Sequence, residues 1–215
     1  QRTTRDLKGA QDKEAADLKL LLEKIHPHLD QAKPLRTLNL SIIEKKMIKS
    51  MCLLTLKPTM YIANVDENGF ENNAHLKAIE KIALLEDAPI VTICNKLESE
   101  IAELTDDDEK LKFLHEMGMD EPGLNRLIIA GYQLLKLHTF FTAGPKEVRA
   151  WTVPIGATAP QSAGKIHTEF EKGFIRAEIV SYDDFIAGNG EQGAKEAGKW
   201  RLEGKEYVVE GGDVE

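Results

Sequence analysis

Cysteine and long apolar runs are both scarce in this chain of 215 residues. Its two cysteines, Cys52 and Cys94, lie in separate apolar segments without a CxxC pair or a nearby histidine cluster, which argues against a disulfide framework and a structural zinc site. No apolar run approaches the ~20 residues that span a bilayer, and Gln1 begins no signal-peptide-like stretch. We therefore expect a cytoplasmic protein that does not enter a membrane.

A phosphate-binding motif is also missing. The sequence contains no Gly-x-x-x-x-Gly-Lys-Ser/Thr, the loop that cradles nucleotide phosphates and supplies a hydroxyl to Mg²⁺. Its six histidines show no Ser/His/Asp spacing, and Asp-x-x-Gly at 66–69 and 120–123 has the composition of turns. We therefore assign no catalytic residue and no metal ligand to this chain.

Charge is distributed unevenly along the sequence. Residues 1–58 hold 12 basic and 7 acidic side chains (net +5), residues 59–133 hold 6 and 16 (net −10), and residues 134–215 hold 10 and 13 (net −3). A basic first segment beside an acidic middle leaves room for a local positive face. Solvated helix surfaces are the simpler explanation of the same charges.

The first part of the chain, residues 1–57, predicts two helices. An amphipathic stripe over 11–29 should be kinked or ended by Pro27, and a second stripe over 43–54 follows Ser41 and Glu44, which have the spacing of a capping box. The pair predicts an antiparallel hairpin, either a coiled-coil arm or half of a bundle. The expected apolar set is Leu18, Leu22, Ile25, Met47, Met51 and Leu54.

The middle part, residues 58–137, has the pattern of a parallel α/β sheet. Short apolar runs at 59–63 and 89–94 enclose a helix that ends near Leu85, and two further helices are expected over 106–117 and 124–137. Two strands are too few for a stable doubly wound sheet, so this part should belong to a larger α/β domain.

The last part, residues 138–215, predicts a small α+β domain. Strands at 139–142 and 148–153 flank a Gly-Pro turn, and a helix over 162–170 precedes strands at 174–180 and 207–209. The expected core is Trp151, Val153, Ile166, Phe170 and Ile175.

Two loops at the carboxyl ends of the expected parallel strands are candidates for nucleotide-base contacts. The first resembles the Asn-Lys-x-Asp loop of GTPases, in which the Asp carboxylate accepts hydrogens from guanine, but it has Val in place of Lys and Glu in place of Asp. Guanine selectivity should therefore be lost, although such residues after a strand also form simple turns. The candidates are Asn64, Val65, Asp66 and Glu67, and then Cys94, Asn95 and Lys96.

A third candidate combines basic and aromatic side chains in residues 145–176. Such a mixture suits contact with RNA phosphates and stacking on bases, but aromatics in a domain core with solvated lysines would have the same composition. The candidate RNA-binding residues are Lys146, Arg149, Lys165, Lys172 and Arg176, and the aromatics are Trp151, Phe170 and Phe174.

Several long motifs resemble the YchF family of Obg-like ATPases, also called EngD. They are YIANVDE (61–67), EPGLNR (121–126) and FFTAGPKEVRAWT (140–152). The segments GATAPQ (156–161) and GKIHTEFEKGFIRA (164–177) are similar to the family's TGS domain, a β-grasp module shared with threonyl-tRNA synthetases and stringent-response synthetase/hydrolase proteins.

The resemblance implies an α/β plus α+β protein with a helical coiled-coil arm (1–57), the C-terminal part of a Ras-like P-loop NTPase domain (58–137) and a TGS domain (138–215). It implies binding and hydrolysis of ATP with Mg²⁺ in preference to GTP, and association with ribosomes. It places residues 64–67 in the altered base-specificity loop and 94–96 in the last base-contacting loop.

The chain also departs from the family pattern. It looks like the C-terminal two-thirds of a member: it begins inside the arm, lacks the phosphate loop and both switches, and stops at residue 215, where members continue with an apolar strand. Alone it should bind nucleotide weakly and be inactive. Ribosome or RNA, without DNA specificity, is the expected partner; the alternative is a non-catalytic adaptor whose TGS domain binds a protein or regulatory ligand.

Overall fold

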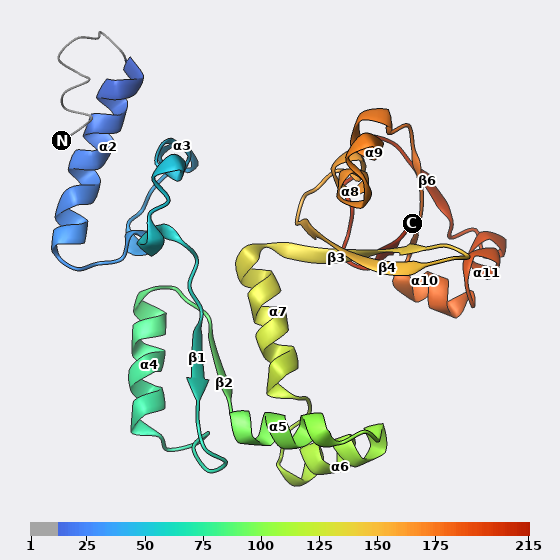
Figure 1. The fold of residues 1–215 in the computed structure, drawn as a ribbon, viewed down its shortest axis with the longest axis horizontal. Helices are drawn as coiled ribbons and strands as arrows, with labels where there is room; N and C mark the ends of the chain where they lie inside the picture. The colour runs from blue at the N-terminus through green and yellow to red at the C-terminus, as the bar shows by residue number, and fades with distance from the viewer. Residues whose placement is uncertain (1–12) are drawn as a thin grey trace. The chain divides into compact units, whose positions relative to one another are not determined.

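The computed structural model describes residues 13–215 and divides the chain into two units, residues 1–127 and 128–215 (Figure 1). The first twelve residues of the expected arm, and with them the expected helix start at residue 11, lie outside the described residues. The division falls inside helix α7 (Gly123–Leu135). The helical and α/β parts both fall within the first unit.

The helical part contains α2 (Lys13–Asp30), α3 (Ile42–Met47) and three single-turn 3₁₀ helices: η1 (Leu35–Thr37), η2 (Lys49–Met51) and η3 (Leu54–Leu56). The expectation that Pro27 ends the helix is wrong, because α2 continues three residues beyond it. A proline in the last turn removes only one helical hydrogen bond. The second helix is shorter than predicted: Ile48 leaves helical geometry, and Cys52 takes the left-handed conformation at φ 48°.

The Ser41–Glu44 capping box is confirmed. The backbone N–H of Glu44 donates to Ser41 Oγ at 3.2 Å, and the Ser41 N–H donates to Glu44 Oε2 at 2.7 Å. Lys24 Nζ donates to the other carboxylate oxygen of Glu44 at 2.7 Å, and this hydrogen bond is the main cause that lowers the pKa of Glu44 to about 2. The box thus also joins the two helices of the hairpin.

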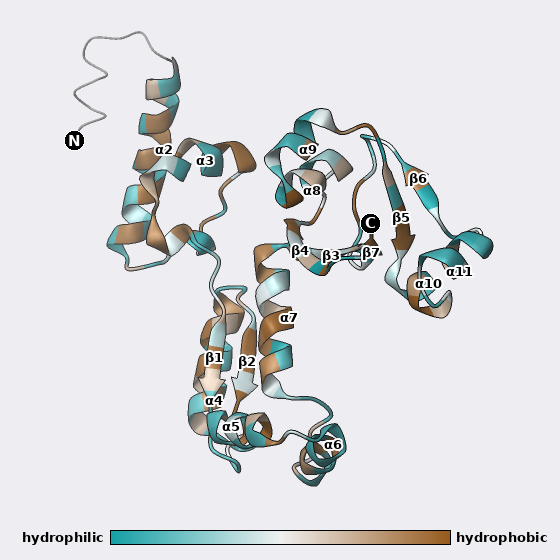
Figure 2. Cartoon of the chain, turned by 45° about the vertical axis from the view of Figure 1, so that its right-hand side comes forward, coloured by the Kyte–Doolittle hydropathy of each residue, from teal (hydrophilic) through white to brown (hydrophobic). Residues whose placement is uncertain are grey.

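The core of the helical part differs in detail from the expected set. Ile25 is buried as expected, whereas Leu18, Leu22 and Met47 are half-buried. Met51 and Leu54 are exposed, because the second helix ends at Met47 and no longer aligns its later residues with one face. The buried cluster is Leu21, Ile25, Leu35, Leu40 and Ile48. Figure 2 shows hydrophobic and hydrophilic residues alternating along α2.

The α/β part has the expected parallel pair. Strands β1 (Tyr61–Asn64) and β2 (Ile90–Ile93) pair from Tyr61 opposite Ile90 to Asn64 opposite Ile93, and α4 (Ala74–Leu85) connects them. Helix α5 (Asn95–Glu103), which the sequence pattern did not predict, begins directly after β2 and is followed by α6 (Asp107–Glu116) and α7. No helix in residues 13–215 is long and apolar enough to cross a bilayer.

A half-buried polar cluster joins the helical part to the α/β part. Arg36 donates to Glu86 Oε2 from Nε at 2.9 Å and from Nη2 at 2.7 Å, and the Tyr61 hydroxyl donates to the same oxygen at 3.0 Å. The hydrogen bond from Arg36 holds the pKa of Glu86 below its ordinary value near 4.5. Charge-assisted bonds of this kind are stronger than neutral ones, so the cluster stabilises the first unit.

Arg36→Met should lower the stability of the first unit by about 1–2 kcal/mol, because it removes two charge-assisted bonds and leaves Glu86 half-buried. Because the pKa of Glu86 is depressed in the folded state, the loss of stability caused by Arg36→Met should be greatest at neutral pH. It should shrink as the pH falls below the ordinary pKa of a glutamate. Urea unfolding followed by circular dichroism measures it. The tryptophan fluorescence transition is the control and should not move, because both tryptophans, Trp151 and Trp200, lie in the second unit.

The second unit is a mixed five-stranded sheet with helices. In chain order it contains β3 (Leu137–Ala143), β4 (Val148–Pro154), α8 (Ala159–Ile166), α9 (Thr168–Gly173), β5 (Ala177–Ser181), α10 (Tyr182–Ala187), α11 (Glu191–Glu196), β6 (Arg201–Glu203) and β7 (Asp213–Val214). The strand order is β4-β3-β7-β5-β6. The β3–β4 hairpin is confirmed, whereas α10, α11 and β6 were not predicted.

Two strand expectations for this unit are wrong. Residues 207–209 form only an isolated bridge between Val208 and Thr158, and the strand that fills the sheet between β3 and β5 is β7. The strand expected from Phe174 begins only at Ala177. Phe174, before the strand, is buried, whereas Ile175 and, on α9, Phe170 are exposed. Of the expected core, Val153 is buried and Trp151 and Ile166 are half-buried.

Candidate functional site

The two candidate base loops face one crevice. Residues 64–68 and 94–96 together line a hollow of about 530 Å³ at the carboxyl ends of β1 and β2. The two loops meet because Asn64 and Ile93 are paired in the parallel register, so both strands end at one level. The Val65 N–H continues the ladder by donating to the Ile93 carbonyl at 2.9 Å.

Asn64 ties the two loops together. Its side-chain oxygen Oδ1 accepts from the backbone N–H of Asn95 at 3.0 Å, across 31 residues of chain. Asn95 is the first residue of α5, whose first N–H groups lack helical partners, and Cys94 before it offers no side-chain cap. Asn64 therefore caps the start of α5 through the Asn95 backbone.

Glu67 and Lys96 form an ion pair across the crevice. Lys96 Nζ donates to Glu67 Oε1 at 2.6 Å, and this hydrogen bond is the main cause that raises the pKa of Lys96. Both side chains are exposed, at 40% for Glu67 and 69% for Lys96. Such a pair contributes little to stability and can open when a ligand competes for either partner.

A pair of hydrogen bonds that joins Glu98 on α5 to the start of α7, here called the Glu98 clamp, was not predicted from the sequence. Glu98 on α5 accepts from the backbone N–H of Gly123 at 2.7 Å and from that of Leu124 at 3.1 Å, and so caps the start of α7. Arg126 on the first turn of α7 donates to the carbonyl of Thr92 on β2 at 3.1 Å. Gly123 and Arg126 belong to the EPGLNR motif, which is visible in the sequence. Glu98, which accepts from the Gly123 N–H, lies 25 residues earlier in the chain, so the motif alone does not reveal it.

Gly123→Ala should destabilise the chain by about 1–2 kcal/mol, because a Cβ there would lie 2.7 Å from Glu98 Oε1 and 2.9 Å from Ile93 Cγ2. Gly131→Ala in the same helix is the matched control: its Cβ meets nothing within 4 Å, and alanine should stabilise the helix by roughly 0.5–1 kcal/mol. Urea unfolding followed by circular dichroism compares the two. Equal effects of the same sign would show that the clamp does not constrain Gly123.

The candidate RNA-binding residues come from two places in the second unit. Lys146 and Arg149 lie at the β3–β4 turn and its following strand, and Lys165, Lys172 and Arg176 lie on or just after α8 and α9. The candidates therefore fall into two groups by element, a hairpin group and a helix group.

Arg149 contacts both an aromatic ring and a carboxylate. Its guanidinium carbon lies 4.1 Å from the ring centroid of Trp151, and the indole N–H donates to Thr142 Oγ1 at 3.0 Å. Glu147 lies 3.7 Å from Arg149 as an exposed ion pair. Lys165 and Glu171 line a separate hollow of about 440 Å³ beside the end of β4. Among residues 13–215 no three His, Cys, Asp or Glu side chains form a group that could hold a metal ion.

Comparisons with known proteins agree on one family. The family model YchF-GTPase_C, described as a protein of unknown function (DUF933), matches residues 137–215. The "Ribosome-binding ATPase YchF" of Pasteurella multocida is 60% identical over 214 residues, which are 100% of this chain and 58% of the relative. The protein of the same name from Bacillus subtilis is 49% identical over 206 residues, 94% of this chain and 56% of the relative.

Solved structures show the same likeness. The Schizosaccharomyces pombe YchF GTPase matches with a TM-score of 0.83 at 31% identity, over 99% of this chain and 60% of that chain. A GTP-binding protein from Pyrococcus horikoshii matches in fold, with a TM-score of 0.53 at 16% identity, over 97% of this chain and 57% of that one. This chain thus spans less than two thirds of the length of each. With identity near 60% across its whole length, the chain belongs to the YchF family.

Proposed function

We propose that residues 64–68 and 94–96 form the base-binding part of a nucleotide site that prefers ATP to GTP. The observation that carries this proposal is the convergence of the two loops on one crevice, fixed by the bond between Asn64 and the Asn95 backbone. Ligands of parallel α/β sheets bind at this edge of the strands. The relatives' printed names include both an ATPase and a GTPase, so base choice has to be argued from the residues.

The Glu67–Lys96 pair supports the preference for adenine. Guanine recognition of the GTPase type needs a carboxylate with both oxygens free to accept two hydrogens from the base. Here Lys96 competes with a base for one oxygen of Glu67, so guanine binding of that type would first have to displace this exposed pair. Val65, where the GTPase loop has lysine, offers an apolar side chain beside the base, and backbone groups around it are the natural partners of adenine.

Hydrolysis would need groups that this sequence does not contain. We propose that the chain contributes the base site, while a phosphate loop of the type absent here would hold the triphosphate and Mg²⁺. In this proposal ATP hydrolysis belongs to proteins that carry both elements, and the chain alone binds nucleotide weakly without turnover. A cytoplasmic site of action follows from the proposed ribosome partner.

The loop assignment predicts how base choice should change. Val65→Lys combined with Glu67→Asp should shift the ratio of GTP to ATP binding toward GTP by about tenfold or more, because it restores a bidentate acceptor. Lys96→Met should shift it the same way but less, by freeing Glu67. Ligand-observed NMR detects weak binding of both nucleotides to the 215-residue chain.

The matched control for these variants is Glu103→Asp, which shortens an exposed acid on α5 away from both loops. It should leave the ATP to GTP ratio unchanged. A wild-type chain that prefers GTP, or a double variant with an unchanged ratio, would show that residues 64–67 do not set base choice.

We further propose that the ribosome is the partner of this chain, with the helical part and the second unit as its contact surfaces. The names of the bacterial relatives support the partner, and the two basic groups of the second unit supply side chains for phosphates. In this proposal the second unit is the TGS domain of the protein. The rival is a non-catalytic adaptor whose second unit binds a protein or regulatory ligand.

Salt dependence separates these two proposals. Each phosphate neutralised by a basic side chain releases counterions, so ribosome affinity should fall steeply with salt in cosedimentation. Replacing Lys165, Lys172 and Arg176 by Gln should reduce the slope of log affinity against log salt by up to about 3. Replacing both Lys146 and Arg149 by Gln should reduce the same slope by up to about 2. Lys199→Gln with Lys205→Gln, elsewhere in the unit, is the control. A flat salt response would favour the adaptor.

A further inference from the structure

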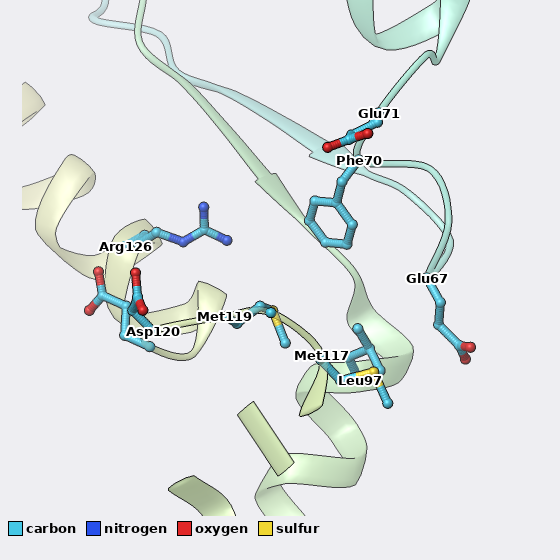
Figure 3. A pocket seen from close by; sticks show the side chains of 10 residues that line it. Glu67, Phe70, Glu71, Leu97, Met117, Met119, Asp120 and Arg126 are labelled. Carbon is cyan, nitrogen blue, oxygen red and sulfur yellow. The ribbon is translucent and has the colours of Figure 1, made fainter. Parts of the chain in front are cut away.

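A second hollow of about 560 Å³ lies beside the base crevice in the first unit and shares Glu67 with it. Figure 3 shows apolar side chains across its middle and charged side chains around its edge. The apolar floor is Phe70, Leu97, Met117 and Met119. The rim is Glu67, Glu71, Asp120, Glu121 and Arg126.

The wall that carries the two methionines is held by specific backbone bonds. Helix α6 ends at Glu116, Met117 is its C-cap residue, and Gly118 at φ 69° turns the chain back, a conformation that favours glycine. The Met119 N–H then donates to the Leu114 carbonyl at 2.8 Å. Further along the chain, the Gly123 N–H donates to Glu98. The segment that carries the two methionines is therefore anchored by backbone hydrogen bonds at both ends.

The rim is strongly acidic. Arg126 already donates to the Thr92 carbonyl, and Glu67 is paired with Lys96. The three remaining carboxylates have no hydrogen-bond or ion-pair partner in the described part of the chain; they are Glu71, Asp120 and Glu121. Surface carboxylates gathered around a low-dielectric hollow focus a negative potential into it.

We propose that this hollow, the methionine hollow, docks a basic segment of a partner polypeptide, with one lysine or arginine side chain inserted. The long apolar stem of such a residue would cover the Met117, Met119 and Leu97 surface while its charge meets the carboxylates at the rim. The face of Phe70 adds attraction for a cation. Flexible thioethers adapt to more than one inserted stem.

Charge decides between this occupant and the alternatives. RNA is disfavoured, because its phosphates would meet the three unpaired carboxylates. A purely apolar helix would bury those carboxylates without partners, at a desolvation cost that no interaction offsets. A basic segment avoids both costs, because its long side chain covers the apolar floor and its charge pairs with the carboxylates of the rim. The proposal does not depend on the nucleotide site.

The test uses the 215-residue chain and a fluorescein-labelled peptide, Ser-Lys-Arg-Leu-Lys-Arg-Ser, in fluorescence anisotropy at low salt. Replacing Glu71 and Glu121 by Gln and Asp120 by Asn removes the rim charges with little change in shape, and should weaken peptide binding about tenfold or more. The control replaces Glu80, Glu103 and Glu109 by Gln, which removes three exposed charges elsewhere in the unit. It should weaken binding less than about twofold.

A second variant tests the floor independently of charge. Met117→Gln keeps the side-chain length and should weaken peptide binding roughly threefold to tenfold, while the salt dependence of binding stays unchanged. NMR of the labelled chain should place the peptide-induced shifts at residues 117–121 and 70–71. Equal losses in rim and control variants would overturn the proposal, because they would show attraction to net charge alone. Equal binding of a peptide with Gln at every basic position would overturn it as well.

Discussion

The parallel pairing of β1 with β2 places the polar loops of the first unit. Four residue pairs, from Tyr61 opposite Ile90 to Asn64 opposite Ile93, bring both carboxyl ends to one level. The loop after β1 then lies against the start of α5, where Asn64 accepts from the Asn95 backbone and Lys96 donates to Glu67. The base crevice and the neighbouring methionine hollow both exist because of this register, and a shift by one residue would separate their walls.

The sequence was most informative where local signals decide the structure. Short apolar runs bounded by polar turns predicted β1 and β2, and the spacing of Ser41 and Glu44 predicted the cap of α3. The two candidate base loops were picked out by their places after these strands, and the structure brings them to one crevice. What failed depends on tertiary packing: Phe174 rather than Ile175 enters the core, and the second helix ends at Met47, which leaves Met51 and Leu54 exposed.

The parts of the site that were missed involve partners distant in sequence. Glu98 caps α7 from 25 residues away, and no local spacing reveals such a bond. The methionine hollow combines the loop after β1 with α5 and the α6–α7 connection, so its residues look unrelated in the sequence. Its acidity was visible only as the net −10 of residues 59–133, which solvated helices also explain.

The account depends on the two loops acting as one base site, and amide NMR of the 215-residue chain titrated with ATP tests this most directly. We predict shifts in both loops together, at 64–68 and at 95–96, with much smaller shifts there when inorganic tripolyphosphate replaces ATP. Shifts confined to one loop, or equal shifts with tripolyphosphate, would contradict it.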